Sequence, residues 1–206
     1  MSAVPDIIPE QIATLRIELV DTDPLIWRQV EVPTSITLRA LHDVIQAAMG
    51  WFDQHLWELR LGKQTYGSPM DGDWGDAPRI DAGKIRLSQI LKPRKTVIDY
   101  TYDFGDSWEH RLTFTDIRHG QPDTAYPRYC AGDQAAPPED CGGLPGFYAV
   151  LEALTDPNHP GHPDVAEWYA NYEPGVLDDL PLKVAIGRIA SRRRAGKTRK
   201  VRPSDE

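Results

Sequence analysis

Alternating apolar and polar positions predict two β-strands early in the chain. Residues 14–20 place apolar side chains at every second position, and residues 26–32 do so apart from Arg28. This period of two is typical of strands that bury one face. The segment between them, 21–24, contains two aspartates and a proline, which favour a tight turn. We therefore expect a hairpin.

A helix is predicted directly after this hairpin. Thr37 is a suitable N-cap. Gly50 stands where a helix commonly ends in the left-handed conformation, and Trp51 follows as the apolar residue that folds back after the cap. The apolar residues between these ends are spaced to line one helix face: Leu38, Leu41, Val44, Ile45, Ala48 and Met49.

The remaining pattern predicts an α+β fold. Strands are expected over residues 55–62 and 96–104, with a short turn-like apolar segment at 86–91. The order strand, strand, helix, strand, turn-like segment, strand is that of a β-grasp (ubiquitin-like) mixed sheet with one packed helix. Apolar residues return at helical spacing between 145 and 190, which predicts a C-terminal helical extension. These helices are expected to cover one face or end of the sheet, because an open sheet must bury its apolar face.

The length favours one domain with a C-terminal addition. The chain has 206 residues, 40% of them hydrophobic, which is enough to bury a core. We expect a single α+β domain over residues 1–190. Within it, residues 12–118 form the β-grasp-like core, and residues 119–190 form a motif loop and helices.

Charge separates the end of the chain from this domain. The net charge of −8 combines −14 over residues 1–187 with +6 over residues 188–206. An acidic body opposes the wrapping of nucleic acid, so nucleic acid is expected to contact only a basic, disordered tail at 191–206. A solvated terminus without a binding role explains the same charges equally well. The candidate contacts in the tail are Arg192, Arg193, Arg194, Lys197, Arg199 and Lys200.

The hairpin around Gly105 concentrates polar chemistry. A three-residue loop over 105–107 gives one continuously apolar face, whereas a two-residue loop mixes the faces. The first register pairs Tyr102 with His110 and sets Asp103 opposite Glu109. Like charges in opposed positions are destabilising. We expect compensation by a basic side chain such as that of Arg111, a shared proton or a hard cation, although a solvated hairpin tip is the simpler interpretation.

The hairpin carries a first acidic string, DFGDSWEH at 103–110, and a second, PPEDCGG at 137–143, follows it in the sequence. The two strings together supply the candidate ligand-binding residues: Asp103, Asp106, Glu109, His110, Glu139, Asp140 and Cys141. No nucleophile elbow, phosphate-binding loop, dinucleotide fingerprint or HExxH string appears in the sequence. Whether the chain is an enzyme, and which catalytic residues it would use, therefore stays open.

The two cysteines give a weak metal hypothesis. Cys130 and Cys141 are too far apart for a zinc knuckle, and only His159 and His162 approach the spacing of zinc ligands. Two reduced thiols are the simpler interpretation, and they fit a cytoplasmic protein. No run of 18 apolar residues and no signal-peptide pattern appears, so we expect no membrane association.

Several stretches resemble the plasmid pRiA4b open-reading-frame-three-like family, which includes insertion-sequence passenger proteins, some labelled TnpR. The similarity covers roughly residues 12–185. The resemblance implies a compact α+β domain of bacterial, plasmid or mobile-element origin without an established activity. It also implies that the residues of the two acidic strings share a site, without assigning roles to them. The stretches that carry it are IWRQVEVP, TLRALHDVIQAAMGW, HLWEL, YDFGDSWEH, PPEDCGGLPGFYAVLEAL and DPNHPGH.

Two functions of different classes are compatible with these residues. The first is a noncatalytic accessory or interaction module that binds a protein, peptide or small ligand beside the cluster from Asp103 to Cys141. The second is a metal-dependent hydrolase or nuclease. Its ligands for a divalent cation and its general base would be Asp103, Asp106, Glu109 and His110. The sequence does not decide the cofactor, and a divalent metal is the one candidate that it offers.

Overall fold

The chain folds as an α+β protein around one mixed sheet. A computed structural model describes residues 10–68, 79–92 and 95–201, with side chains described up to residue 196. In this part of the chain the sheet has eight strands in the order β5-β4-β3-β6-β7-β1-β2-β8. The strands are β1 Gln11–Leu19, β2 Trp27–Pro33, β3 Trp57–Leu61, β4 Gln64–Gly67, β5 Ile80–Asp81, β6 Val97–Tyr102, β7 Trp108–His119 and β8 Arg128–Asp133.

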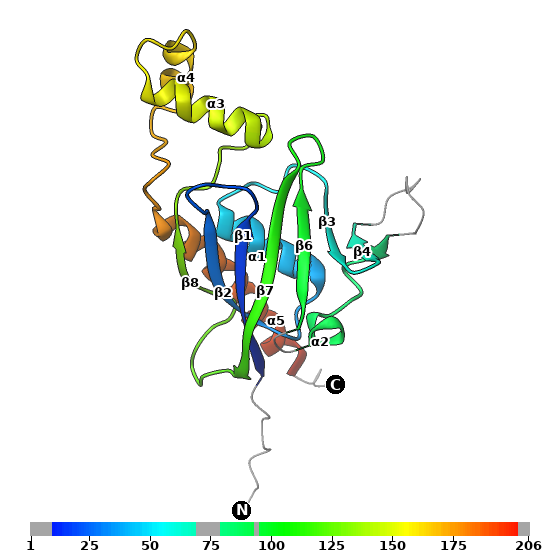
Figure 1. Cartoon of the computed structure of the whole chain (residues 1–206). Helices are drawn as coiled ribbons and strands as arrows, with labels where there is room; N and C mark the ends of the chain where they lie inside the picture. The colour runs from blue at the N-terminus through cyan, green and yellow to red at the C-terminus, as the bar shows by residue number, and fades with distance from the viewer. Residues whose placement is uncertain (1–9, 69–78, 93–94, 202–206) are drawn as a thin grey trace, which may run out of the picture.

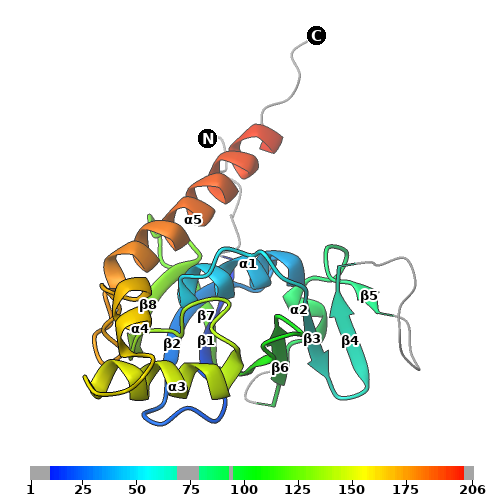
Figure 2. The ribbon, with the colours of Figure 1, turned by 90° about the horizontal axis from the view of Figure 1, so that it is seen from above.

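The helices are distributed unevenly around the sheet. Helices α1 and α5 lie against one face of it, whereas α3 and α4 project beyond one end (Figures 1 and 2). None of the helices among the described residues is both long and apolar enough to cross a lipid bilayer. The helices are α1 Leu38–Met49, α2 Leu87–Ile90, α3 Gly143–Thr155, α4 His162–Trp168 and α5 Asp179–Val201.

The first hairpin and its helix are confirmed. Strands β1 and β2 pair antiparallel, and the alternate apolar residues of β1 are buried. Arg28 interrupts the pattern of β2, yet its side chain is buried and its Nε donates a hydrogen bond to the carbonyl oxygen of Ala48 (3.0 Å). Ala48 lies in the last turn of α1, where carbonyl groups lack partners within the helix. The arginine therefore ties the end of α1 to the sheet.

The ends of α1 also follow the sequence expectation. The Thr37 hydroxyl accepts a hydrogen bond from the amide of Ala40 (3.2 Å). Gly50 has a φ of 81°, and its amide donates to the carbonyl of Gln46. Trp51 folds back and is buried in the core. The apolar face predicted for this helix is thus the face that packs on the sheet.

The sheet is larger than the sequence pattern indicates. The strands expected over 55–62 and 96–104 correspond to β3 and β6, and the turn-like segment at 86–91 contains the single turn α2. Strands β4, β5 and β8 were not expected. Two of them are too short to show a period, and β8 is an edge strand in which only Tyr129 is buried.

The register expected for the hairpin of β6 and β7 is wrong by two residues. Tyr102 pairs with Trp108, and Glu109 pairs with Thr101. A shift of two leaves every side chain on its own face, so the apolar face is as predicted while the opposed acids are not. Asp103 lies in the connecting loop and Glu109 in the ladder. The actual register instead sets Arg111 opposite Asp99, which is the favourable pairing of opposite charges.

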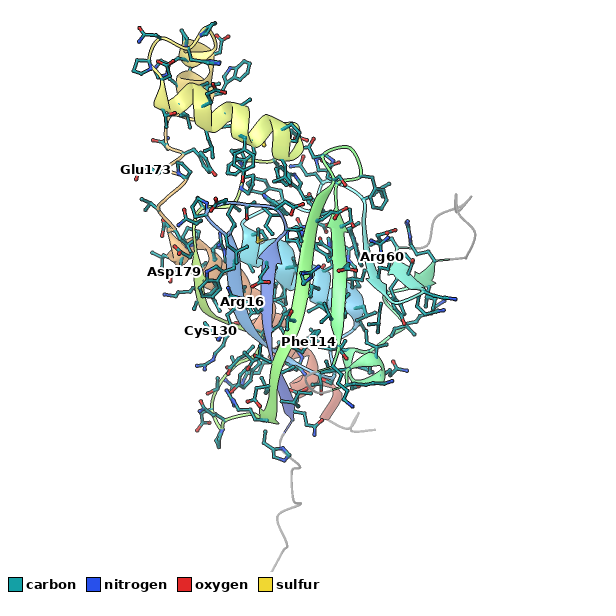
Figure 3. All side chains as sticks on the ribbon, viewed as in Figure 1. Arg16, Arg60, Phe114, Cys130, Glu173 and Asp179 are labelled. Atoms are coloured by element: carbon teal, nitrogen blue, oxygen red, sulfur yellow. The ribbon has the colours of Figure 1, made fainter. Side chains whose placement is uncertain are left out.

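The basic end of the chain continues a helix. The prediction of a disordered tail is wrong for residues 191–201, because α5 extends to Val201. Leu182, Ile186 and Ala190 are buried at helical spacing and hold this helix against the body. Alanine, arginine and lysine beyond them are strong helix formers. Residues 202–206 lie outside the described residues. Figure 3 marks Glu173 on the connection that leads from α4 back to Asp179, where α5 begins.

Candidate functional site

The two acidic strings meet at one end of the sheet. The loop between β6 and β7 begins at Asp103, which has a φ of 55°. Its amide donates to the carbonyl of Leu56 (2.8 Å), and its Oδ1 accepts from the amide of Gly105 (2.9 Å). These bonds turn the Asp103 carboxylate back over its own loop. Its second oxygen, Oδ2, faces His55.

The second string is anchored to the loop that follows α1. Trp51 Nε1 donates to the carbonyl of Pro137 (2.9 Å). The Glu139 carboxylate accepts from the hydroxyl of Tyr102 (2.7 Å) and from the amide of Phe52 (2.9 Å). Glu139 therefore joins three segments that are distant in the sequence, and both of its oxygens have partners.

Asp106 links the β6–β7 loop to the start of α3. One of its oxygens, Oδ2, accepts a hydrogen bond from the amide of Gly142 (3.2 Å). Gly143 has a φ of 66°, and a Cβ atom there would lie 2.4 Å from the carbonyl oxygen of Asp106. The two strings are thus in backbone contact, and glycine is required at this position. Figure 1 shows the N-terminal end of α3 beside the β6–β7 loop.

His55 lies between the two strings. Its Nδ1 is 3.7 Å from Asp103 Oδ2, and its Nε2 is 3.0 Å from Asp140 Oδ1. The second distance suits a hydrogen bond, yet Nε2 is buried and makes none, so the ring nitrogen is not directed at that oxygen. A cavity of about 350 Å³ adjoins Asp103 and is lined by Gln54, His55, Leu56, Asp103, Phe104 and Gly105. We call His55, Asp103 and Asp140 the His55 cluster; their ligand atoms lie within 4.8 Å of one another.

Two of the expected site residues lie elsewhere. Glu109 is exposed on the face of the sheet opposite α1, beside Thr101 and Arg111. His110 is buried in the core, where its Nδ1 lies 3.1 Å from the carbonyl of Trp108. Burial lowers the pKa of His110 to about 4, so its ring is neutral at pH 7.

The cysteines do not assemble with the histidines. Cys130 lies on edge strand β8 (Figure 3), and Cys141 lies at the junction of the two strings; both thiols are free. Burial, with a smaller contribution from Asp106, raises the pKa of Cys141 to about 12, which disfavours a thiolate ligand. His159 accepts from the amide of Gly161, and His162 lies 2.7 Å from the carbonyl of Ala153. Among the described residues, these four do not form a common metal-ligand group.

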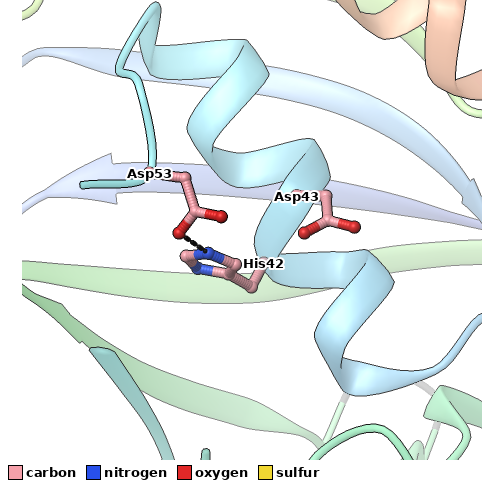
Figure 4. Close-up of side chains that lie close together, drawn as sticks. All are labelled: His42, Asp43 and Asp53. Carbon is pink, nitrogen blue, oxygen red and sulfur yellow. Dashed lines mark hydrogen bonds and ion pairs between the residues drawn. The ribbon is translucent and has the colours of Figure 1, made fainter. Parts of the chain in front are cut away.

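A second histidine and aspartate pair lies under α1. His42 Nε2 is 2.7 Å from Asp53 Oδ1 (Figure 4), and its Nδ1 is 2.9 Å from the hydroxyl of Tyr100. Arg39 donates to Asp53 Oδ2 (2.7 Å). Burial lowers the pKa of His42 to about 4, although its bond to Asp53 acts in the opposite direction. Asp43 also pairs with Arg39. We call His42, Asp43 and Asp53 the His42 cluster.

The sequence expectation missed His42, Asp53 and His55. His42 stands four residues after Leu38 on the apolar face of the predicted helix, which is a signal for a buried polar contact. His55 opens the segment expected as the third strand, where nothing in the pattern separates it from an ordinary strand end. Only the tertiary contact with the two acidic strings identifies it.

An aromatic groove adjoins the second string. It has a volume of about 440 Å³ and lies between the loop after α1, the 136–139 segment and the 167–172 segment. Phe52 and Trp168 on its rim are 76% and 73% exposed. The Tyr172 hydroxyl in its wall is buried without a hydrogen-bond partner among the described residues. The groove thus combines exposed aromatic surface with the carboxylates of Glu139 and Glu167.

Comparison with solved structures defines the class of fold. The chain is similar to the protein described as "Protein of Unknown Function MM3350" from Methanosarcina mazei Go1, with a TM-score of 0.76 and 32% identity. The match covers 82% of this chain and 96% of that one. This chain and that protein therefore share one α+β fold.

The sequence comparisons then give the family. The family model described as "Plasmid pRiA4b ORF-3-like protein" matches residues 11–180, and the chain belongs to this family. The "Uncharacterized protein y4hQ" of Sinorhizobium fredii (strain NBRC 101917 / NGR234) is 36% identical over 188 residues, which are 88% of this chain and 93% of that protein. The family resemblance inferred from several stretches of the sequence is confirmed.

Proposed function

We propose that the chain is a noncatalytic binding module that holds an extended peptide in the aromatic groove. The observation that carries this proposal is the exposure of two large aromatic side chains, Phe52 and Trp168, in the lining of one groove. Large aromatic side chains are usually buried, and clusters of exposed ones mark interaction sites. The groove is open at the surface, where an extended segment can enter it.

The lining of the groove favours a peptide that contains proline and a basic residue. Aromatic-lined grooves accept proline-rich segments, which are extended before they bind and lose little entropy. Glu139 and Glu167 line the same groove and add negative charge, which complements lysine or arginine.

The positions of the other candidate residues support a noncatalytic role. A metal-dependent hydrolase would need Glu109 and His110 beside the cation-binding carboxylates. Glu109 lies on the outer face of the sheet, and His110 is enclosed by the core. The set Asp103, Asp106, Glu109 and His110 is therefore not brought together around one cavity.

The proposal is tested by titrating the full chain with synthetic peptides of ten residues while its tryptophan fluorescence is recorded. We expect saturable binding of a peptide of alternating proline and arginine. The same peptide with glutamate in place of arginine should bind at least tenfold more weakly. Trp168→Ala should weaken binding at least tenfold, or about 1.4 kcal/mol.

Leu180→Ala provides the matched control for Trp168→Ala. Leu180 is a large apolar side chain that is 65% exposed and lies outside the groove. Its truncation should leave the affinity unchanged. Equal affinities of the Trp168→Ala and Leu180→Ala variants, or no binding of the arginine peptide at millimolar concentration, would contradict the proposal.

Three finer expectations remain proposals beside this one. The order of the first hairpin and α1 supports a β-grasp arrangement for β1, β2 and α1. The antiparallel pairing of β1 with β7 confines this arrangement to those three elements. Origin on a mobile element is supported by the family resemblance, and a cytoplasmic location by the free cysteines. Contact of the basic end with nucleic acid would use the arginines of α5, although Arg193 is engaged by Glu10.

A further inference from the structure

The His55 cluster combines metal-binding groups from three separate segments. His55 precedes β3, Asp103 begins the β6–β7 loop, and Asp140 belongs to the second acidic string. Each offers one ligand atom, and these atoms lie within 4.8 Å of one another. Donor atoms bound to one cation at about 2.1 Å lie roughly 3 to 4 Å apart. The distance of 3.0 Å between His55 Nε2 and Asp140 Oδ1 falls in this range. Asp103 Oδ2 lies 3.7 Å from the other ring nitrogen, Nδ1, and Asp103 joins the set through the 4.8 Å limit that all three ligand atoms share.

The direction of the imidazole is a second, independent observation. His55 Nε2 is buried and 3.0 Å from Asp140 Oδ1, yet it makes no hydrogen bond to this oxygen or to any other described residue. Two donors that share a cation at about 2.1 Å and lie about 3 Å apart have the nitrogen lone pair about 45° from the line between them. An N–H in that direction is too bent to be a hydrogen bond. The contact therefore fails as a hydrogen bond, and this failure is compatible with two ligands of one ion.

Negative charge around the cluster lacks a basic counterpart. Asp106 and Glu139 belong to the same junction as the two ligand carboxylates. Among the described residues, neither Asp103 nor Asp140 forms an ion pair with lysine or arginine, and each lies within ion-pair distance of His55 alone. The Asp103 and Asp140 carboxylates on either side of one imidazole repel one another unless a cation compensates them.

The His42 cluster shows what a satisfied version of the same residue types looks like. Both nitrogens of His42 have hydrogen-bond partners, and Arg39 neutralises Asp53 and Asp43. A metal ion would have to displace the guanidinium and break one of these two bonds. This cluster is thus a structural network, and it supplies a matched control.

We propose that His55, Asp103 and Asp140 bind one divalent cation at the junction of the two acidic strings. One imidazole with two carboxylates suits Mn²⁺, Fe²⁺ or Zn²⁺ better than the all-oxygen preference of Ca²⁺ or the thiolate preference of Cu⁺. The ion joins the loop before β3, the β6–β7 loop and the segment before α3. This proposal extends the proposed function, because the bound ion would fix one wall of the groove. Binding of the ion does not depend on peptide binding.

The test is isothermal titration of the untagged full chain, first dialysed against a chelator, with MnCl₂ and separately with ZnCl₂. We expect one ion per chain. Asp140→Asn and His55→Gln should each weaken binding at least tenfold. Asp140 is exposed, so its variant should fold normally, and circular dichroism checks both variants.

Asp43→Asn distinguishes the two histidine clusters. Asp43 belongs to the His42 cluster and is as accessible as Arg39 beside it, so its variant should bind Mn²⁺ like the unchanged chain. The proposal is overturned if Mn²⁺ and Zn²⁺ do not bind saturably, or if Asp140→Asn and His55→Gln leave binding unchanged. It is also overturned if Asp43→Asn is the variant that abolishes binding. The peptide titration with Trp168→Ala remains a separate measurement, so the two proposals can fail independently.

Discussion

The His42 cluster and the His55 cluster use the same residue types in opposite ways. Under α1, every polar atom of His42 has a partner, and the ring stacks on Trp57 with centroids 4.0 Å apart. At the end of the sheet, His55 has a buried nitrogen without a hydrogen bond between two carboxylates. Arg39 is present in the first cluster, and no arginine or lysine pairs with the ligand carboxylates of the second among the described residues.

This difference separates a structural network from a binding site. A buried polar group stabilises a fold when all of its hydrogen bonds are made, and it destabilises the fold when they are not. Glutamine and tyrosine complete the first network, because Gln46 Nε2 donates to the Tyr100 hydroxyl (2.8 Å). The second cluster is complete only with a ligand. Removal of His42 should therefore lower stability more than removal of His55.

His42→Ala should produce the largest effect on stability. The substitution removes two buried hydrogen bonds and the stacking on Trp57, leaves Tyr100 and Asp53 with one hydrogen-bond partner fewer each, and opens a cavity. We expect a loss of about 4 kcal/mol in the free energy of unfolding, measured by urea denaturation. His55→Ala in metal-free buffer should cost less than about 1 kcal/mol. Equal losses in the two variants would remove the distinction between the clusters.

Acid should lower the stability of the fold through its buried histidines. Burial lowers the pKa of both His42 and His110 to about 4, below the value of about 6.5 in the unfolded chain. The unfolded chain therefore binds more protons between these values, so stability is full above pH 6.5 and falls as the pH drops toward 4. Each histidine should contribute a loss of about 2 kcal/mol between pH 6.5 and 5.

Urea denaturation at pH 7, 6 and 5 measures this dependence. His110→Leu should flatten it by about half, because it removes one of the two titrating rings. An unchanged slope in His110→Leu would show that burial of this ring does not control its protonation.

Gly143→Ala tests the contact that brings the two acidic strings together. A Cβ atom would lie 2.4 Å from the carbonyl oxygen of Asp106, and the φ of 66° is unfavourable for alanine. We expect a loss of about 2 kcal/mol in thermal or urea unfolding and a weaker Mn²⁺ affinity. Gly175→Ala is the control, because its Cβ meets no atom within 4 Å. Similar behaviour of the two variants would mean that the loops do not need this close approach.

Glu109→Gln should have the smallest effect. Glu109 is exposed and pairs across the ladder with Thr101, away from the His55 cluster. We expect a change in stability within about 0.5 kcal/mol and an unchanged affinity for Mn²⁺ by titration. A tenfold loss of Mn²⁺ affinity would show that Glu109 belongs to the metal site, and it would favour the register that sets Glu109 opposite Asp103.

The elements that the sequence predicts well are those long enough to repeat their hydrophobic period several times. The hairpin of β1 and β2 and the helix from Leu38 to Met49 have enough positions for the alternation and the caps to be recognised. Strands β4 and β5 are too short for that, and they depend on pairing with β3. The helical end of α5 depends on the burial of Leu182 and Ile186 against the body, which the run of basic residues does not reveal.

The candidate site was only partly predictable for a related reason. Asp103 and Asp140 stood out because of their unusual strings, and they do lie at the same junction. The register of the β6–β7 hairpin could not be fixed by burial alone, because a shift of two residues preserves the apolar face. The amide of Asp103 bonds to Leu56, and this tertiary contact places the residue in the loop. His55 was not predictable at all, since only folding brings it between the two strings.

Anomalous X-ray scattering from a crystal of the full chain grown with MnCl₂ tests the central claim most directly. The account predicts one strong manganese peak within about 2.2 Å of a ring nitrogen of His55 and of oxygens of Asp103 and Asp140. It also predicts that the peak disappears in crystals of Asp140→Asn. A peak between His42 and Asp53, or no manganese peak at the junction of the two acidic strings, would contradict it.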